Sequence, residues 1–187
     1  MGIIEKFRQS SKELKDTRTL VKCAMFIALY VALKMLRLQI DVDKALFNLE
    51  FLAIAFSGAL FGPVASIIVG CAGDLLHSLT GTLSGGFNWG FTINNAVSGL
   101  LYGLILYKNM SIIRCVIAKF IEIVVISWFM TNIWLVMSFD INAIMPMAIS
   151  RAPIKLGASL PIEMAIFIIL VLVLKPVLQK IEPQRKL

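Results

Sequence analysis

The chain has 187 residues, of which 59% are apolar and only 16% are charged, and its mean hydropathy is +0.88. Soluble domains carry about 25% charged residues, so this composition is typical of an integral membrane protein and excludes a water-soluble ATPase, kinase or DNA-binding module. The net charge of +7 does not indicate nucleic-acid binding, because the basic residues gather near the chain ends and in one short loop.

The first 18 residues carry mixed charges, with apolar side chains at roughly helical spacing, and are predicted to lie on the membrane surface. We expect residues 1–18 to form a cytoplasmic, interfacial segment, residues 19–180 a membrane domain and residues 181–187 a cytoplasmic tail. The apolar runs predict an all-α integral membrane protein, a compact bundle of six transmembrane helices with shaped extracellular loops. The expected spans are 19–38, 47–61, 63–79, 91–107, 115–139 and 161–178.

Three connections between these spans are unusual. Gly62-Pro63 separates the second span from the third, because proline removes a backbone donor and fits best in the first turn of a helix. Residues 80–90 form a glycine-rich loop containing Phe87 and Trp89, where the backbone can approach a ligand closely. Residues 140–160 combine prolines, glycine and cations with apolar residues, a pattern typical of a broken or re-entrant segment.

The distribution of cations predicts the orientation. Of the 18 Lys and Arg residues, six precede residue 23, three lie in 108–119 and four follow residue 174. Because cytoplasmic segments carry the excess of Lys and Arg, we expect a multi-pass protein of the cell membrane with both termini cytoplasmic. The glycine-rich loop and residues 140–160 then share the extracellular face, where a ligand enters.

Two predicted spans carry stripes of small residues, on which another helix can approach closely. The first span contributes Ala24, Ala28 and Ala32, and the fourth contributes Asn95, Gly99 and Gly103. Packing against the protein's own helices is the commoner reason for such a stripe, and docking of a partner is the alternative.

Ionisable residues within apolar runs are costly and therefore indicate candidate functional sites. Asp74 and His77 lie one turn apart, and the pattern leaves open whether they bind a polar ligand, stabilise the bundle as a pair or relay protons. Arg151 and Lys155 are four residues apart and would suit an anionic group, arginine bidentately and lysine as a point charge. Snorkelling to lipid phosphates is their alternative role.

Aromatic side chains near the extracellular loops offer flat surfaces to a ring-bearing ligand, or belong to the interfacial aromatic belt of a membrane protein. They are Phe87, Trp89, Trp128 and Trp134. Asn132 shares a helix face with Trp128, whereas Trp134 points nearly opposite Asn132 unless the helix changes there.

The sequence contains no HExxH, G-x-S-x-G, P-loop or CxxC motif, and its three cysteines lie in or beside apolar runs with no histidine near enough to complete a metal-ligand pattern. We therefore expect no enzyme activity, no metal and no cofactor. A secondary transporter would more often show an internal repeat, and this chain has no convincing one.

Several of these features together resemble the substrate-binding (S) component of energy-coupling factor (ECF) vitamin transporters. They are the small size, the six spans, the Ala24-xxx-Ala28 stripe, and Phe61-Gly62-Pro63 before a span that ends in Gly73-Asp74. The later segments resemble the folate-specific branch, in the runs Thr131-Asn132-Ile133-Trp134-Leu135, Ser150-Arg151-Ala152-Pro153-Ile154-Lys155 and Leu160-Pro161-Ile162-Glu163.

The resemblance implies that the chain captures folate outside and delivers it through a membrane coupling subunit driven by two ATPase subunits. It places Ala24, Ala28 and Ala32 at the coupling surface. The chemistry of folate, rather than an aligned site, suggests the residue roles. Ring walls would come from Phe87, Trp89 and Trp134, cations for the glutamate tail from Arg151 and Lys155, and polar contacts from Asp74, His77, Asn132 and Glu163. Riboflavin or thiamin is the alternative substrate, and a stand-alone transporter coupled to protons through Asp74 and His77 is the alternative mechanism.

Overall fold

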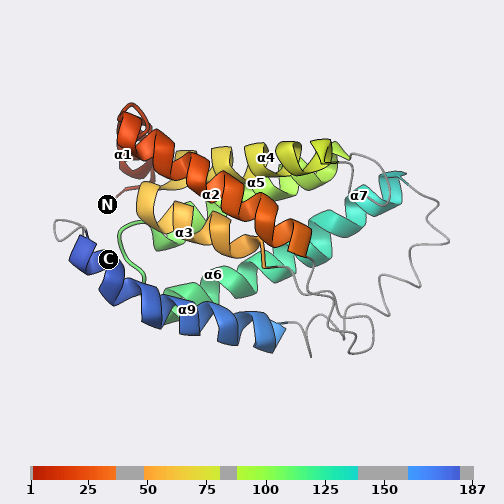
Figure 1. Ribbon diagram of the computed structural model, residues 1–187. Helices are drawn as coiled ribbons and strands as arrows, with labels where there is room; N and C mark the ends of the chain where they lie inside the picture. The colour runs from red at the N-terminus through yellow and green to blue at the C-terminus, as the bar shows by residue number, and fades with distance from the viewer. Residues whose placement is uncertain (1, 37–48, 81–87, 139–159, 182–187) are drawn as a thin grey trace.

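The computed structural model describes residues 2–36, 49–80, 88–138 and 160–181, and within these ranges the chain is helical without a strand. The elements are α1 (Ile3–Glu13), α2 (Thr17–Leu36), α3 (Phe51–Phe61), α4 (Pro63–Leu79), α5 (Trp89–Leu106), α6 (Ile112–Ile121), η1 (Glu122–Met130), α7 (Thr131–Ser138) and α9 (Leu160–Ile181). The all-α prediction is therefore confirmed for the described residues. α1 and the carboxyl-terminal end of α9 lie at the same end of the bundle (Figure 1).

Each predicted apolar run falls on one of these helices, except the fifth, which falls on the continuous helical run α6–η1–α7. Among the described residues, α2 alone is long and apolar enough to qualify by itself as a membrane-crossing helix. The apolar helices Phe51–Phe61, Pro63–Leu79 and Leu160–Val173 are shorter. The number of spans stays a prediction.

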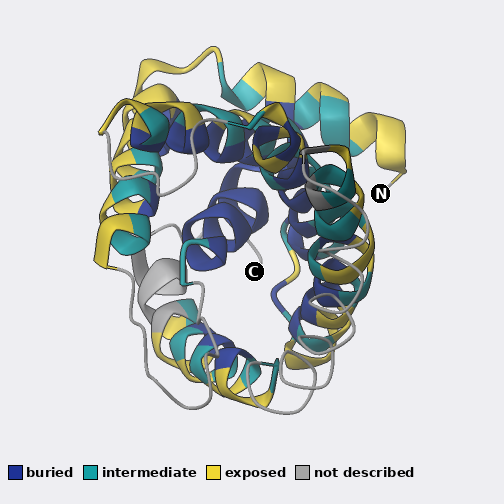
Figure 2. Cartoon of the chain, turned by 90° about the vertical axis from the view of Figure 1, so that its right-hand side faces the viewer, coloured by how far each residue is buried: buried dark blue, intermediate teal, exposed yellow. Residues whose placement is uncertain are grey.

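Helix α3 forms the centre of the bundle. All 11 of its residues are buried, and Figure 2 shows a wholly buried helix inside a ring of others. Its small residues let neighbouring backbones approach, and its polar side chain is satisfied, because Ser57 Oγ donates to Ile54 O at 2.9 Å. A helix that is apolar on every face belongs in a core rather than at a surface.

Glycines bring α4 and α5 into backbone contact. A Cβ added at Gly103 would lie 2.3 Å from Pro63 Cα, and one at Gly99 would lie 2.6 Å from Ser66 O. Asn95 completes this stripe, because its carbonyl oxygen would lie 2.7 Å from a Cβ at Gly70. The small residues predicted in the fourth span therefore serve internal packing.

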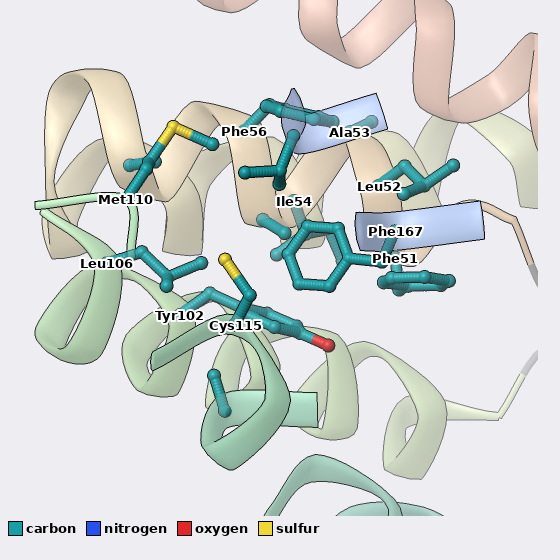
Figure 3. Packing of buried hydrophobic residues seen from close by; sticks show 14 of the residues in the cluster. Phe51, Leu52, Ala53, Ile54, Phe56, Tyr102, Leu106, Met110, Cys115 and Phe167 are labelled. Atoms are coloured by element: carbon teal, nitrogen blue, oxygen red, sulfur yellow. The ribbon is translucent and has the colours of Figure 1, made fainter. Parts of the chain in front are cut away.

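Aromatic rings fill the space between α3, α5 and α9 (Figure 3). Phe167 stands edge-on to three rings, at centroid distances of 5.5 Å from Phe51, 6.1 Å from Phe56 and 6.1 Å from Tyr102. Edge-to-face pairs of this kind each add about 0.5–1.5 kcal/mol to the stability that burial of the rings supplies.

Helix α1 is anchored to the turn between α3 and α4. Ser10 is fully buried there, and its Oγ donates to Phe61 O at 2.6 Å and accepts from the backbone N–H of Val64 at 3.2 Å. Gly62 adopts φ 85°, which only glycine adopts readily, and a Cβ at Gly62 would also meet Ser10 at 2.8 Å. At the last residue of α1, Tyr107 Oη donates to Glu13 Oε1 at 2.9 Å, and nearer the start of the helix Lys6 Nζ donates to Leu104 O at 2.6 Å. Most of the segment predicted to be interfacial is thus a helix fixed to the bundle, and its position at the membrane surface stays a prediction.

Candidate functional site

An ion pair joins α2 to α4 in the interior. Lys34 Nζ lies 2.5 Å from Asp74 Oδ1 and 3.1 Å from the hydroxyl of the fully buried Tyr30. Thr92 of α5 donates to the other oxygen, Asp74 Oδ2, at 2.7 Å. Asp74 therefore bonds with side chains from two other helices, and His77, only 1% exposed, lies one turn further along α4.

A second buried charge cluster joins α6 and η1 to α9. Lys119 Nζ lies 2.9 Å from Glu122 Oε2 and 2.8 Å from Glu163 Oε2, and the lysine side chain is 2% exposed. The ammonium also lies 3.4 Å from the centroid of the Phe51 ring, a cation–π contact. Lys119, counted among the cytoplasmic cations in the sequence, is therefore an interior residue, and Glu163 is held by an ion pair.

Trp134 of α7 is bonded to the amino-terminal part of α5. Its indole Nε1 donates to Asn94 Oδ1 at 3.0 Å, and Asn94 Nδ2 donates to Thr131 Oγ1 at 3.1 Å. A Cβ added at Gly90 would lie 2.4 Å from the Trp134 ring, so the indole lies directly on the Gly90 backbone. The last residues of the glycine-rich loop thus contact one of the predicted ring walls.

The helix changes type just before this point. Residues Glu122–Met130 form a π-helix, a feature that occurs frequently at functional sites, and Thr131 follows it with its N–H bonded to Ile126 O. Asn132 Nδ2 donates to the carbonyl of Trp128 at 2.5 Å, one turn back. Asn132 and Trp128 therefore share a face, as predicted, while Trp134 reaches inward to α5.

The other candidates take different positions. Trp89, the first residue of α5, is 67% exposed, and Trp128 is 53% exposed. Phe87, Arg151 and Lys155 lie outside the described residues. The structure therefore brings Asp74 together with Lys34, Glu163 with Lys119, and Trp134 with Asn94. Within the described ranges, no three His, Cys, Asp or Glu residues come together in a way that could hold a metal.

The alanine stripe of α2 faces outward. Ala24, Ala28 and Ala32 are all exposed, whereas Cys23 and Tyr30 on the same helix are buried against the bundle. Large apolar side chains beside the stripe are exposed too, among them Val21 and Met25. Internal packing, the commoner reason for such a stripe, does not account for this one.

Four residues that the sequence reading did not select carry much of this arrangement. They are Lys34, Thr92, Asn94 and Lys119. Each is a polar residue inside an apolar run. Because placing a polar side chain in a membrane costs free energy, this position alone could have identified all four as candidates.

A family model described as "ECF-type riboflavin transporter, S component" matches residues 15–181. The chain is 30% identical to "Folate transporter FolT" of Clostridium novyi over 124 residues, which cover 65% of this chain and 70% of the relative. It is 29% identical to "Folate transporter FolT" of Leuconostoc mesenteroides over 126 residues, 66% of each chain. A solved structure described as FolT bound with folic acid superposes with a TM-score of 0.69 at 25% identity, covering 81% of this chain and 91% of that one.

Proposed function

This chain belongs to the family of ECF-type transporter S components, and from that membership we propose that it is the folate-binding subunit of an ATP-driven vitamin importer. The family and both curated relatives are transport proteins of the membrane, so the chain is not an enzyme. One observation supports folate above all, namely the likeness to a structure holding folic acid over 81% of the chain. The family is described as riboflavin transporters, so riboflavin is the alternative substrate.

In the proposed site the rings of folate lie against aromatic walls, and its glutamate tail meets cations. Trp134 supplies a wall beside the start of α5, together with Trp89 and Phe87 from the glycine-rich loop. Arg151 and Lys155 hold the tail carboxylates, because an arginine fork binds carboxylates bidentately.

The polar edge of the pterin ring meets groups from α4, α7 and α9. Asp74 and Glu163 accept from its amino and ring N–H groups, since each carboxylate oxygen has a second lone pair beyond its present bond. His77 and Asn132 supply further polar contacts. Lys34 and Lys119 support this role by keeping both carboxylates fixed in place.

The outward alanine stripe is the proposed docking surface for the membrane coupling subunit, which two ATPase subunits drive. Small side chains allow close helix approach where lipid supplies no hydrophobic driving force between helices. The exposure of Ala24, Ala28 and Ala32 supports this assignment. A multi-pass topology with both termini cytoplasmic agrees with α1 and the end of α9 lying at one end of the bundle (Figure 1).

Titration of the purified protein in detergent tests the substrate. We expect saturable heat and a change in tryptophan emission with folate, and neither with riboflavin or thiamin. Trp134→Phe removes most of the emission change, whereas Trp128→Phe, the same substitution at an exposed position, retains it. Binding of riboflavin instead of folate would contradict the folate assignment while leaving the family intact.

A further inference from the structure

We propose that Asn94 is a positioning residue for substrate binding, which fixes the plane of the Trp134 indole so that the ligand meets only the ring face. This inference rests on the proposed function, because it takes Trp134 as a wall of the folate site. The inference goes beyond the proposed function in two ways. It states how Trp134 recognises the ligand, and it names a residue, Asn94, that aids recognition without touching the ligand.

The hydrogen bonds around Asn94 form a chain with a single possible direction. An indole N–H can only donate and a backbone carbonyl can only accept, so Trp134 stands at one end and Ile126 O at the other. Between them, Asn94 Oδ1 accepts from Trp134 at 3.0 Å, Asn94 Nδ2 donates to Thr131 Oγ1 at 3.1 Å, and Thr131 Oγ1 donates to Ile126 O at 2.9 Å.

Burial makes this series of hydrogen bonds a firm restraint on the Trp134 side chain. Asn94 is 5% exposed, so its amide cannot exchange these partners freely for water, and a buried polar group without a partner is costly. The side chain at position 94 must accept from the Trp134 N–H and donate to the Thr131 hydroxyl, because the hydrogen of that hydroxyl already bonds to Ile126 O. The amide of asparagine meets this requirement, and neither leucine nor a charged aspartate does.

A second restraint acts on the ring itself. A Cβ at Gly90 would lie 2.4 Å from both Cγ and Cδ2 of Trp134, so the indole rests on the α5 backbone without room for any side chain. With its N–H bonded to Asn94 and one side against Gly90, the ring keeps its plane. Its remaining, half-buried surface is apolar.

The recognition mode follows from these restraints. Because the indole N–H is already bonded within the protein, it is not available to read a hydrogen-bond acceptor on the ligand. Trp134 therefore selects a flat ring by stacking, and polar groups of the ligand are read elsewhere in the site. The expected ligand class at this position is an aromatic heterocycle presented face-on.

A double-mutant cycle on folate affinity tests the proposal. Asn94→Leu should weaken folate binding about five- to tenfold, which corresponds to one lost hydrogen bond. If Asn94 acts only through Trp134, the same change in a Trp134→Phe background should add less than about twofold, because the indole N–H that it holds is gone. Equal effects of Asn94→Leu in both backgrounds would overturn the proposal, since Asn94 would then act independently of Trp134.

Emission of the ligand-free protein gives a second readout. In a Trp128→Phe background, Asn94→Leu should shift the remaining tryptophan emission, whereas Asn109→Ala, at an exposed asparagine beyond α5, should leave both emission and affinity unchanged. An unshifted emission would also overturn the proposal. If Asn94→Leu does not fold, Thr131→Val replaces it in the cycle, because it removes the acceptor that anchors the Asn94 amide and keeps the side-chain shape.

The cycle separates this proposal from the proposed function. A wild-type protein that binds no folate contradicts the folate assignment, and the emission test of Asn94 then still reports on the positioning of Trp134. A wild-type protein that binds folate, with additive or absent effects of Asn94→Leu, contradicts the positioning role alone.

Discussion

Replacing Lys119 by Met should be among the most destabilising single changes in the described part of the chain. The ammonium lies 2.9 Å from Glu122 and 2.8 Å from Glu163, and all three side chains are at most 11% exposed. Removing it leaves two buried carboxylates without their cation, and breaking a buried ion pair in this way costs about 3–5 kcal/mol. The loss of the contact with the Phe51 ring acts in the same direction.

Thermal unfolding of the purified protein in detergent measures the effect. For a chain of this length, each kcal/mol lowers Tm by about 2–4 °C, so Lys119→Met should lower Tm by about 6–20 °C. Combining Lys119→Met with Glu122→Gln and Glu163→Gln should recover most of that loss, because the two uncompensated charges disappear together with the cation.

Lys12→Met is the matched control, because Lys12 is exposed on α1 and an exposed charge contributes little to stability. It should change Tm by about 2 °C or less. The reasoning is refuted if Lys119→Met unfolds at the same temperature as Lys12→Met, or if the neutralised triple variant is as unstable as Lys119→Met alone.

Three further predictions address coupling, packing and the ligand. Ala28→Leu should leave folate affinity unchanged and abolish uptake in cells that supply the coupling and ATPase subunits. The control Ile117→Leu, on the exposed face of α6, should leave both affinity and uptake intact. Uptake by the Ala28→Leu variant would exclude Ala28 from the docking surface. Gly103→Ala should lower the free energy of unfolding by at least about 1–3 kcal/mol, because its Cβ would lie 2.3 Å from Pro63 Cα, and an unchanged Tm would show that α4 and α5 separate easily. Arg151→Ala should weaken folate binding, measured by calorimetry, by about 1.5–3 kcal/mol, and unchanged heat and affinity would remove Arg151 from the site.

Much of the fold was predictable because hydropathy and helix punctuation act locally. The Gly62-Pro63 break correctly predicted the last residue of α3 and the first residue of α4, since glycine supplies φ 85° and proline fits the first helical turn. The π-helix Glu122–Met130 was not predicted. An apolar run shows no sign of it, because hydropathy does not distinguish an α-helix from a π-helix.

The candidate site was predicted less completely, because its bonds join helices that are distant in the sequence. Asp74 was recognised as a costly residue in an apolar run, but its partner Lys34 comes from a helix 40 residues earlier. Periodicity similarly identified the alanine stripe of α2 without deciding whether the stripe faces the bundle or points away from it. Burial of Tyr30 and Cys23 settles that question, since both point into the bundle.

Anchoring of α1 determines what a probe on that helix would measure. Lys6 bonds to Leu104 of α5, Ser10 to the α3–α4 turn and Glu13 to Tyr107, so α1 is held to the body from its second turn to its last residue. A spin label or fluorophore at Ile4, which is 84% exposed, would therefore rotate with the whole molecule. Its angle to the bilayer normal would report directly any tilt of the protein during a transport cycle.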